Sequence, residues 1–339
     1  MNSNSKKKEY EGESIDDQKN GIGKEYHENG KLFYEGEFKD DKFHGEGKLY
    51  NLNGKLYYEG KFKDNKFHGE GKQYDENYCN LFQEGEFAGI LLYEGEYQDS
   101  KRNGKGKEYH LNGILKYEGE FKDGKWNGEG KSYNPNGKLY YEGKFIDSKS
   151  HGIGKQYYEN GKLYYEGQFI NDKFHGKGKG YYEGKNGNLM YEGDFIDNNF
   201  HGKGKLYDEN GKLKYEGEFE DGEKNGKGKA YQKNGILGYE GKYKDDKFHG
   251  KGKLYENGNL FHEGNFKDHE IHGKGIRYYE GKYGKQYQGD FIDAKFHGKG
   301  KAYHKNGNLF YEGEFEDNKF QGEGKLYNEN GILYYEGKF

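Results

Sequence analysis

The chain has 339 residues, of which 34% are charged and 30% hydrophobic, and its formal net charge is −4. No apolar run reaches the roughly 18–20 residues that a membrane-spanning helix needs. Basic and acidic residues alternate along the chain, which excludes a basic stripe for nucleic acid, and the single cysteine excludes a disulfide framework or a Cys-based zinc site. We therefore expect a cytoplasmic protein that binds no nucleic acid and needs no cofactor.

The N-terminal residues 1–9 carry charge but no apolar segment, so they read as a disordered tail and not as a secretory signal. From residue 10 to residue 339 one pattern recurs about every 24 residues: Tyr-Glu-Gly-Glu-Phe, six residues, then Gly-x-Gly-Lys-x-Tyr. A fixed period of this size indicates stacked supersecondary units. The copies begin at Tyr10, Tyr34, Tyr58, Tyr93, Tyr117, Tyr141, Tyr165, Tyr191, Tyr215, Tyr239, His262, Tyr287 and Tyr311, with a short last copy from Tyr335.

The copy that starts at Tyr34 serves to number repeat positions 1 to 24. Residues 32–38 alternate with a period of two, which predicts a half-buried strand, and a second strand is expected from Gly45 to about Tyr50. Asn53-Gly54 predicts a type I′ hairpin turn before the next copy. Two strands per repeat predict an antiparallel meander. Strict alternation leaves the direction of Tyr50 open, because it packs on the second face or is redirected by a bulge.

Glycine occupies positions 3, 12 and 14 in all thirteen copies, as in Gly36, Gly45 and Gly47. Because glycine weakens a strand by roughly 0.5–1 kcal/mol relative to alanine, its retention implies a steric need. We expect the rings of positions 1 and 5 to lie against a backbone that has no Cβ. A repeat of two strands is marginal alone, so stability must come from stacking against its neighbours.

These residues, Tyr-Glu-Gly-Glu-Phe followed by His-Gly-x-Gly and Asn-Gly, resemble the MORN repeat (membrane occupation and recognition nexus) over about residues 10–339. MORN units usually have 23 residues and often Trp at position 5, whereas these mostly have 24 and Phe. The stretch 158–163 also resembles a variant found in bacterial MORN-like proteins, some of them labelled antitoxins. The resemblance implies an all-β fold, an elongated single-layer antiparallel meander of MORN-type β-hairpin repeats, used as a scaffold or tether, with lipid binding proposed for the family.

Several residue types that recur in the repeat are also common in catalytic and metal-binding sites. Histidine at position 11 suggests a metal ladder, but successive copies lie roughly 9.6 Å apart, too far to share a ligand sphere, so a structural loop hydrogen bond is the better reading. Aspartate at position 7 fits an Asx-turn better than a calcium site. No helix is expected after Gly-x-Gly, so this motif does not indicate a dinucleotide-binding site. The recurring Glu pairs are interpreted as a solvent-exposed face and not as catalytic carboxylates. We therefore expect no enzyme, catalytic residue or metal site.

Position 24 is variable and often aromatic, which favours a role in recognising a binding partner. Alternation places it on the face opposite positions 1 and 5. The alternative is packing between neighbouring repeats on that second face. The candidate binding residues are Phe33, Tyr57, Tyr140, Tyr164, Phe261, Phe310 and Tyr334.

The array is interrupted at residues 83–92, where one strand and its loop are missing, so a kink, a pairing change or a boundary is expected there. The favoured function is a non-catalytic scaffold that binds one or more proteins. The alternatives are a peripheral membrane tether that binds phospholipid and an antitoxin-like or immunity-like protein that blocks one enzyme. Self-association through terminal edge strands also stays open.

Overall fold

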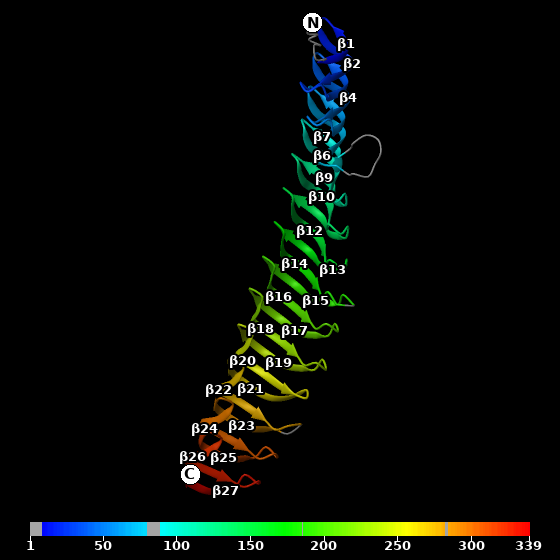
Figure 1. The fold of residues 1–339 in the computed structure, drawn as a ribbon. Helices are drawn as coiled ribbons and strands as arrows, with labels where there is room; N and C mark the ends of the chain where they lie inside the picture. Colours follow the sequence, from blue (N-terminus) through cyan, green and yellow to red (C-terminus); the bar gives the residue numbers. More distant parts are fainter. Residues whose placement is uncertain (1–8, 80–88, 185, 282–283) are drawn as a thin grey trace. The chain divides into compact units, whose positions relative to one another are not determined.

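The computed structural model describes residues 9–79, 89–184, 186–281 and 284–339, and these residues form 27 β-strands and no helix. They divide into two compact units, unit 1 (Met1–Asp172) and unit 2 (Lys173–Phe339). Within each unit every strand pairs antiparallel with its neighbours in chain order (Figure 1). The predicted all-β antiparallel meander is confirmed.

The strands of unit 1 are β1 (Tyr10–Ile15), β2 (Gln18–Tyr26), β3 (Leu32–Lys39), β4 (Lys42–Tyr50), β5 (Leu56–Lys63), β6 (Lys66–Cys79), β7 (Gly89–Gln98), β8 (Lys101–Tyr109), β9 (Leu115–Lys122), β10 (Lys125–Tyr133), β11 (Leu139–Ile146), β12 (Lys149–Tyr157) and β13 (Leu163–Ile170). The strands of unit 2 are β14 (Lys173–Tyr181), β15 (Leu189–Ile196), β16 (Asn199–Tyr207), β17 (Leu213–Glu220), β18 (Glu223–Tyr231), β19 (Leu237–Lys244), β20 (Lys247–Glu256), β21 (Asn259–Lys267), β22 (Glu270–Tyr278), β23 (Lys285–Ile292), β24 (Lys295–Tyr303), β25 (Leu309–Glu316), β26 (Lys319–Tyr327) and β27 (Leu333–Lys338).

The core of each unit is a row of aromatic rings from positions 1 and 5. Tyr34 is fully buried and Phe38 nearly so. The Tyr34 ring meets Phe38 edge-on at 5.1 Å between centroids and meets Phe62 of the next repeat at 5.2 Å. Edge-to-face contacts of this kind add to the free energy gained from ring burial. Each ring is therefore held by its own repeat and by the following one.

The expected steric need for glycine is confirmed at positions 3 and 14. A Cβ on Gly47 would lie 2.6 Å from the Tyr34 ring carbon Cε2, and one on Gly36 would lie 2.6 Å from the Tyr34 hydroxyl oxygen. That hydroxyl donates a hydrogen bond to the Glu37 carbonyl at 2.9 Å. Burial raises the pKa of Tyr34, so the hydroxyl keeps the proton that it donates. Gly45 has a different reason, because its φ of +55° disfavours other residues.

The turn prediction was wrong in most repeats. The two-residue type I′ turn is Asp40-Asp41, where φ is 50° and 65°, between β3 and β4. Asn53-Gly54 lies in a longer loop, in which only Gly54 has positive φ and its N–H donates to the Asn51 carbonyl at 2.8 Å. The reason is the length of the loop, because five residues separate β4 from β5. Asn257-Gly258, with only two residues between β20 and β21, does form the predicted turn.

The predicted tail 1–9 lies outside the described residues except for Glu9, whose carbonyl accepts the Tyr26 N–H at 3.0 Å. Of the predicted interruption at 83–92, residues 83–88 also lie outside them. On either side, β6 pairs with β7 in the usual register, with Gly71 opposite Gly95. A boundary at this stretch stays a prediction.

Candidate binding surface

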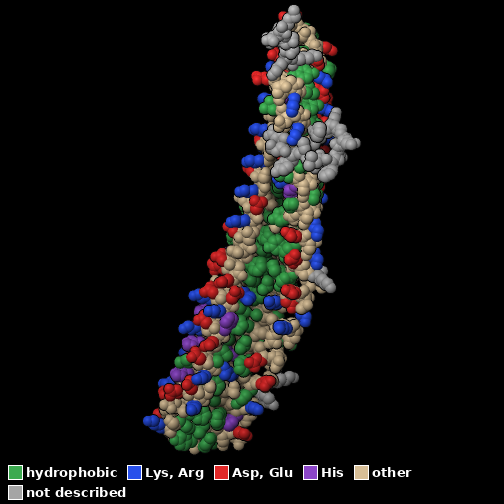
Figure 2. All heavy atoms as spheres, in the orientation of Figure 1, with side chains coloured by type: hydrophobic (Ala, Val, Ile, Leu, Met, Phe, Trp, Pro, Cys, Tyr) green, Lys and Arg blue, Asp and Glu red, His purple; other side chains and the backbone are tan. Residues whose placement is uncertain are grey.

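One face of the sheet, which we call the front face, carries the position 1 rings and is covered by a second aromatic layer. Seven rings at position 10 stack nearly parallel on the position 1 tyrosine of their own repeat, at centroid distances of 3.8–4.5 Å. They are Phe43, Phe67, Trp126, Phe200, Phe248, Phe296 and Phe320. Figure 2 shows hydrophobic side chains gathered on the face in view, between rows of charged side chains. The second layer seals the buried tyrosines and leaves its own outer edge accessible.

Position 24 is a β-bulge residue, which corrects its predicted face. Leu49 pairs with Tyr58 and Tyr50 pairs with Leu56, so no residue of β4 stands opposite Tyr57. The extra residue breaks the alternation along β5. The Phe33 ring lies 5.8 Å from Phe43, which itself stacks on Tyr34, so Phe33 lies on the front face and not opposite it. The same register shift occurs at every candidate residue: Phe33, Tyr57, Tyr140, Tyr164, Phe261, Phe310 and Tyr334.

The open question about Tyr50 is settled by its hydroxyl, which donates to the Glu35 carboxylate at 2.9 Å. Glu35 adjoins Tyr34 in β3 and points to the other side, which we call the reverse face. The Tyr50 side chain therefore lies on the reverse face, and the bulge is in the neighbouring strand β5 and not in β4. Burial, together with the equivalent hydrogen bond from Tyr207 to Glu192, raises the pKa of Tyr207 to about 12.

The candidate residues contact the side chains around them. Three of them lie beside another ring, with centroid distances of 4.7 Å for Phe33 and His27, 4.6 Å for Tyr164 and Tyr158, and 4.9 Å for Phe310 and His304. The hydroxyls of Tyr57 and Tyr140 accept hydrogen bonds from Gln73 and Gln156, at 3.0 and 3.2 Å. Phe261 is covered by the Arg277 guanidinium at 5.0 Å. Tyr140 and Tyr334 are the most open, at 43% and 61% exposed.

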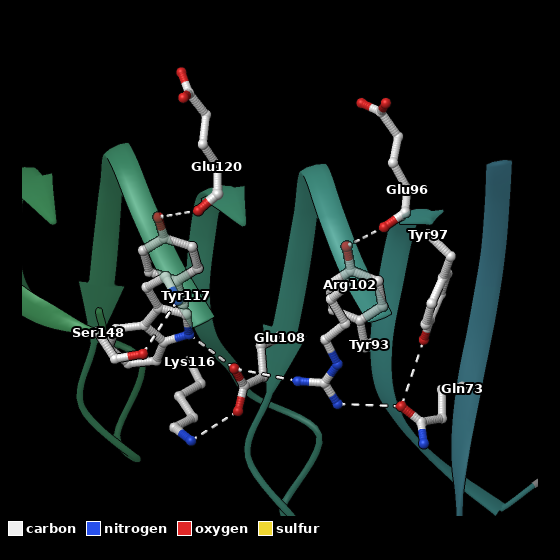
Figure 3. A network of polar contacts seen from close by, with 11 residues as sticks. Gln73, Tyr93, Glu96, Tyr97, Arg102, Glu108, Lys116, Tyr117, Glu120 and Ser148 are labelled. Carbon is white, nitrogen blue, oxygen red and sulfur yellow. Dashed lines mark hydrogen bonds and ion pairs between the residues drawn. The ribbon is translucent and has the colours of Figure 1, made fainter. Parts of the chain in front are cut away.

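A polar cluster interrupts the aromatic layer in unit 1 (Figure 3). The Glu108 carboxylate accepts hydrogen bonds from Lys116 and from the Trp126 indole, both at 2.8 Å, and lies 3.4 Å from Arg102. Burial raises the pKa of Glu108, but the bonds from Lys116 and Trp126 and the charge of Arg102 outweigh it, so the pKa lies below its usual value. The carboxylate is therefore ionised at neutral pH.

The cluster extends to a third repeat through Arg102, which donates to Gln73 at 3.2 Å and stacks over the Tyr93 ring at 4.6 Å. Sequence analysis missed this cluster. A signal was present, because Arg102, Glu108 and Lys116 stand at positions 10, 16 and 24, where most repeats have an aromatic or uncharged residue. Those three variable positions meet on one face, whereas the framework positions lie beneath them.

In unit 2 the framework itself changes at His262, which replaces the position 1 tyrosine. His262 is fully buried, and neither ring nitrogen has a hydrogen-bond partner among the described residues. Burial and the nearby Arg277 lower the pKa of His262 to about 4. The imidazole is thus neutral at pH 7 and behaves as a packing ring without the tyrosine's hydrogen bond.

In five of the eight histidines at position 11, Nδ1 does not make the predicted loop hydrogen bond. This atom is buried and unpartnered in these five: His44, His68, His151, His201 and His249. No group of three or more potential metal ligands occurs in the part of the chain that the structure describes. Within the same residues, no helix is long and apolar enough to cross a membrane.

The repeat sequence matches the MORN repeat model at residues 34–54, 58–79, 117–138, 165–188, 215–236, 239–260, 262–281 and 311–332. The MORN repeat variant model matches at 19–40, 102–123, 150–171, 200–221 and 296–317. Together these matches cover more than half of the chain. The chain belongs to the MORN repeat family. MORN repeats are generally non-catalytic and generally mediate contacts with proteins or membrane lipids.

No curated protein matches this MORN protein. Similar solved structures include TcdB2-TccC3 without its hypervariable C-terminal region, at 12% identity, with 94% of this chain and 18% of that chain covered and a TM-score of 0.17. TcdB2-TccC3 itself matches at 11% identity, covering 94% and 19% of the two chains, with a TM-score of 0.17. The chain spans less than a fifth of their length, and similarity at this level supports no conclusion about fold or function.

Proposed function

We propose that this MORN protein is a non-catalytic scaffold that binds a protein partner through the front face. The observation that carries the proposal is the placement of the variable positions 10, 16 and 24 together on this face, above a framework that hardly varies. Partly exposed aromatic side chains held by stacking are typical of the residues that dominate protein interfaces. The seven candidate residues at position 24 are therefore proposed as contact residues.

The framework gives these contacts a fixed spacing. Each position 10 ring is stacked on a buried tyrosine, so little side-chain entropy remains to be lost when a partner binds. Contacts repeated along the front face of one unit act together, because the first contact raises the effective concentration of the others. The polar cluster around Glu108 would restrict the choice of partner, since an apolar group placed there would leave Arg102 or Lys116 without its bonds.

Site-specific photo-crosslinking in the native cells tests this proposal. A photoreactive residue at Tyr140 probes the front face, and the same residue at Ile153, which is 73% exposed, is the matched control. Ile153 adjoins Gly154, whose missing Cβ faces the Tyr141 ring, so Ile153 points to the reverse face. A stoichiometric protein adduct at 140 that is absent at 153 is the expected result.

Other outcomes would contradict the proposal. Adducts with lipid at 140, together with flotation of the chain on liposomes, would favour the membrane tether. Equal labelling from both positions would mean that the front face is not the binding surface. If the protein adduct is one enzyme whose activity the chain blocks, the scaffold is an inhibitor of the antitoxin-like kind.

A further inference from the structure

The reverse face of unit 2 carries a row of lysines at repeat position 13. Position 13 adjoins the position 14 glycine that lies under the tyrosine ring, so its side chain points away from the aromatic layer. Six successive repeats have lysine there, and all six are exposed: Lys177, Lys203, Lys227, Lys251, Lys274 and Lys299. The net charge of the chain does not reveal this row, because the charges of the basic and acidic residues nearly cancel.

Most of these lysines lack the ion pair that their neighbours have. The position 15 lysines, two residues further along the same strands, pair with the position 2 glutamates, as Lys229 does with Glu240 at 3.5 Å and Lys253 with Glu263 at 3.8 Å. At position 13, Lys177 lies 3.0 Å from Asp194. None of the other five forms an ion pair with a described residue.

The middle of the row is a concentrated positive patch, the basic cluster, formed by Lys227, Lys242 and Lys251. Lys227 of β18 stands directly opposite Lys242 of β19, and Lys251 of β20 stands opposite Asn265. The Lys242 stem lies against Gly250, next to Lys251. Like charges directly opposite each other in a sheet destabilise the strand pair. The cluster thus has a local cost that a negatively charged partner would remove.

In unit 1 the same repeat position is glutamate in three of six repeats, Glu46, Glu70 and Glu129, whereas the other three have Lys105, Ile22 and Ile153. Glu46 and Glu70 are exposed, and neither forms an ion pair with a described residue. Glu70 of β6 stands directly opposite Glu96 of β7, a like-charge pair of the other sign. We call Glu46, Glu70 and Glu96 the acidic cluster. Glu46 and Glu70 are two strands apart, about 9.6 Å, and so are Lys227 and Lys251.

We propose that the basic cluster binds the acidic cluster of a second molecule of this chain. The two clusters have the same spacing, because the same repeat generates both. The basic cluster is net positive, and the acidic cluster stays net negative although Lys61 stands opposite Glu46. A phosphate backbone or an anionic membrane would extend along the whole row and meet carboxylates such as Glu218 and Asp290, which stand opposite lysines of the row, whereas the acidic cluster needs only the middle of the row. The contact uses the reverse face and leaves the front face free.

This association depends strongly on salt. Each contact is an exposed ion pair, which alone contributes little to affinity, so binding requires several pairs at once. At ~1 M salt the Debye length falls to about 3 Å and the attraction is screened. We expect a concentration-dependent dimer or larger assembly at low ionic strength and a monomer at high ionic strength.

Sedimentation analysis of the full chain tests the proposal with a matched pair of variants. Lys227→Gln with Lys251→Gln should weaken self-association at least about tenfold, because it removes two charges that the acidic cluster would meet. Lys229→Gln with Lys253→Gln changes the net charge equally, on the same strands and the same face, and should have a much smaller effect. Circular dichroism confirms that each variant is folded.

Charge reversal provides an independent test. Lys227→Glu with Lys251→Glu, and separately Glu46→Lys with Glu70→Lys, should each prevent self-association. Mixing the two variants should restore a complex, because the reversed clusters attract each other. A chain that stays monomeric at low salt and high concentration, an assembly that ignores salt, equal effects of the two Gln pairs, or no complex in the mixture would each overturn the proposal.

Discussion

The contact between a tyrosine ring and a glycine of the next strand is the smallest unit of this fold. At the repeat that starts at Tyr117, a Cβ on Gly130 would lie 2.6 Å from the ring carbon Cε2. The ring cannot move away easily, because it is stacked on Trp126 and meets Phe121 and Phe145 edge-on. A single methyl group therefore has to displace several rings or the backbone.

We expect Gly130→Ala to lower the free energy of unfolding by about 2–3 kcal/mol, as overpacking does in close-packed interiors. Denaturant titration measures the loss. Gly184→Ala is the control, since no atom lies within 4 Å of its added Cβ and its φ is not positive. Equal stability of the Gly130 variant and the wild type would mean that the ring adapts without cost.

His262 shows what the tyrosine hydroxyl contributes. Its pKa of about 4 lies below the ordinary 6.5, so the unfolded chain binds a proton more readily than the folded chain. Stability conferred by the neutral ring is complete above pH 6.5 and is lost as the pH falls toward 4. The loss at pH 4 is on the order of 3 kcal/mol, from 1.36 kcal/mol per pKa unit.

We expect His262→Tyr to remove this pH dependence and to add about 1 kcal/mol at neutral pH through a restored hydrogen bond. Thermal unfolding between pH 4 and 7 measures both effects. The reverse variant Tyr239→His should introduce the same acid sensitivity one repeat earlier. Parallel stability profiles for wild type and His262→Tyr would show that His262 is not the acid-sensitive group.

At the scale of the element, the two-residue turns connect repeats as well as strands. Asp246 has φ of 63°, and its carboxylate accepts the N–H of Lys224 in the preceding repeat at 3.0 Å. Its own N–H donates to the Lys224 carbonyl at 3.1 Å. Glycine occupies the equivalent place at Gly124 and Gly222, where the backbone bond remains but the side-chain bond is lost.

We therefore expect Asp246→Ala to be about 1 kcal/mol less stable than Asp246→Gly, although alanine is the larger side chain. Both variants lose the carboxylate bond, but only alanine also has to hold the left-handed conformation, which costs roughly 1–2 kcal/mol. Chemical denaturation of both variants measures the difference. If alanine proves the more stable, φ at this turn does not limit stability.

At the scale of the whole molecule, the strands of each repeat pair with those of the next repeat along each unit, so stability should be distributed along the chain in local units. Tyr117 illustrates this, since its ring partners come from its own repeat and the following one. A globular core of the same length would transmit a local defect to every element.

Hydrogen exchange of the Gly130→Ala variant tests this expectation. The loss of protection should be greatest in β9, β10 and β11 and should fade within a few repeats on either side. Mass spectrometry of proteolytic fragments gives this profile. A uniform loss across the chain would show that the repeats unfold as one cooperative unit.

The sequence by itself determined the period, the two strands of each repeat, the buried rings at Tyr34 and Phe38, and the need for glycine beneath them. These are local properties: alternation along a strand and the retention of residue types from copy to copy. The tertiary structure decided the face of position 24 and the type of each turn. Tyr57 reaches the front face because β4 has no residue to pair with it, and this follows from the loop that joins the two strands. Likewise, Glu108 meets Trp126 across 18 residues of sequence, and only the pairing of strands brings them together.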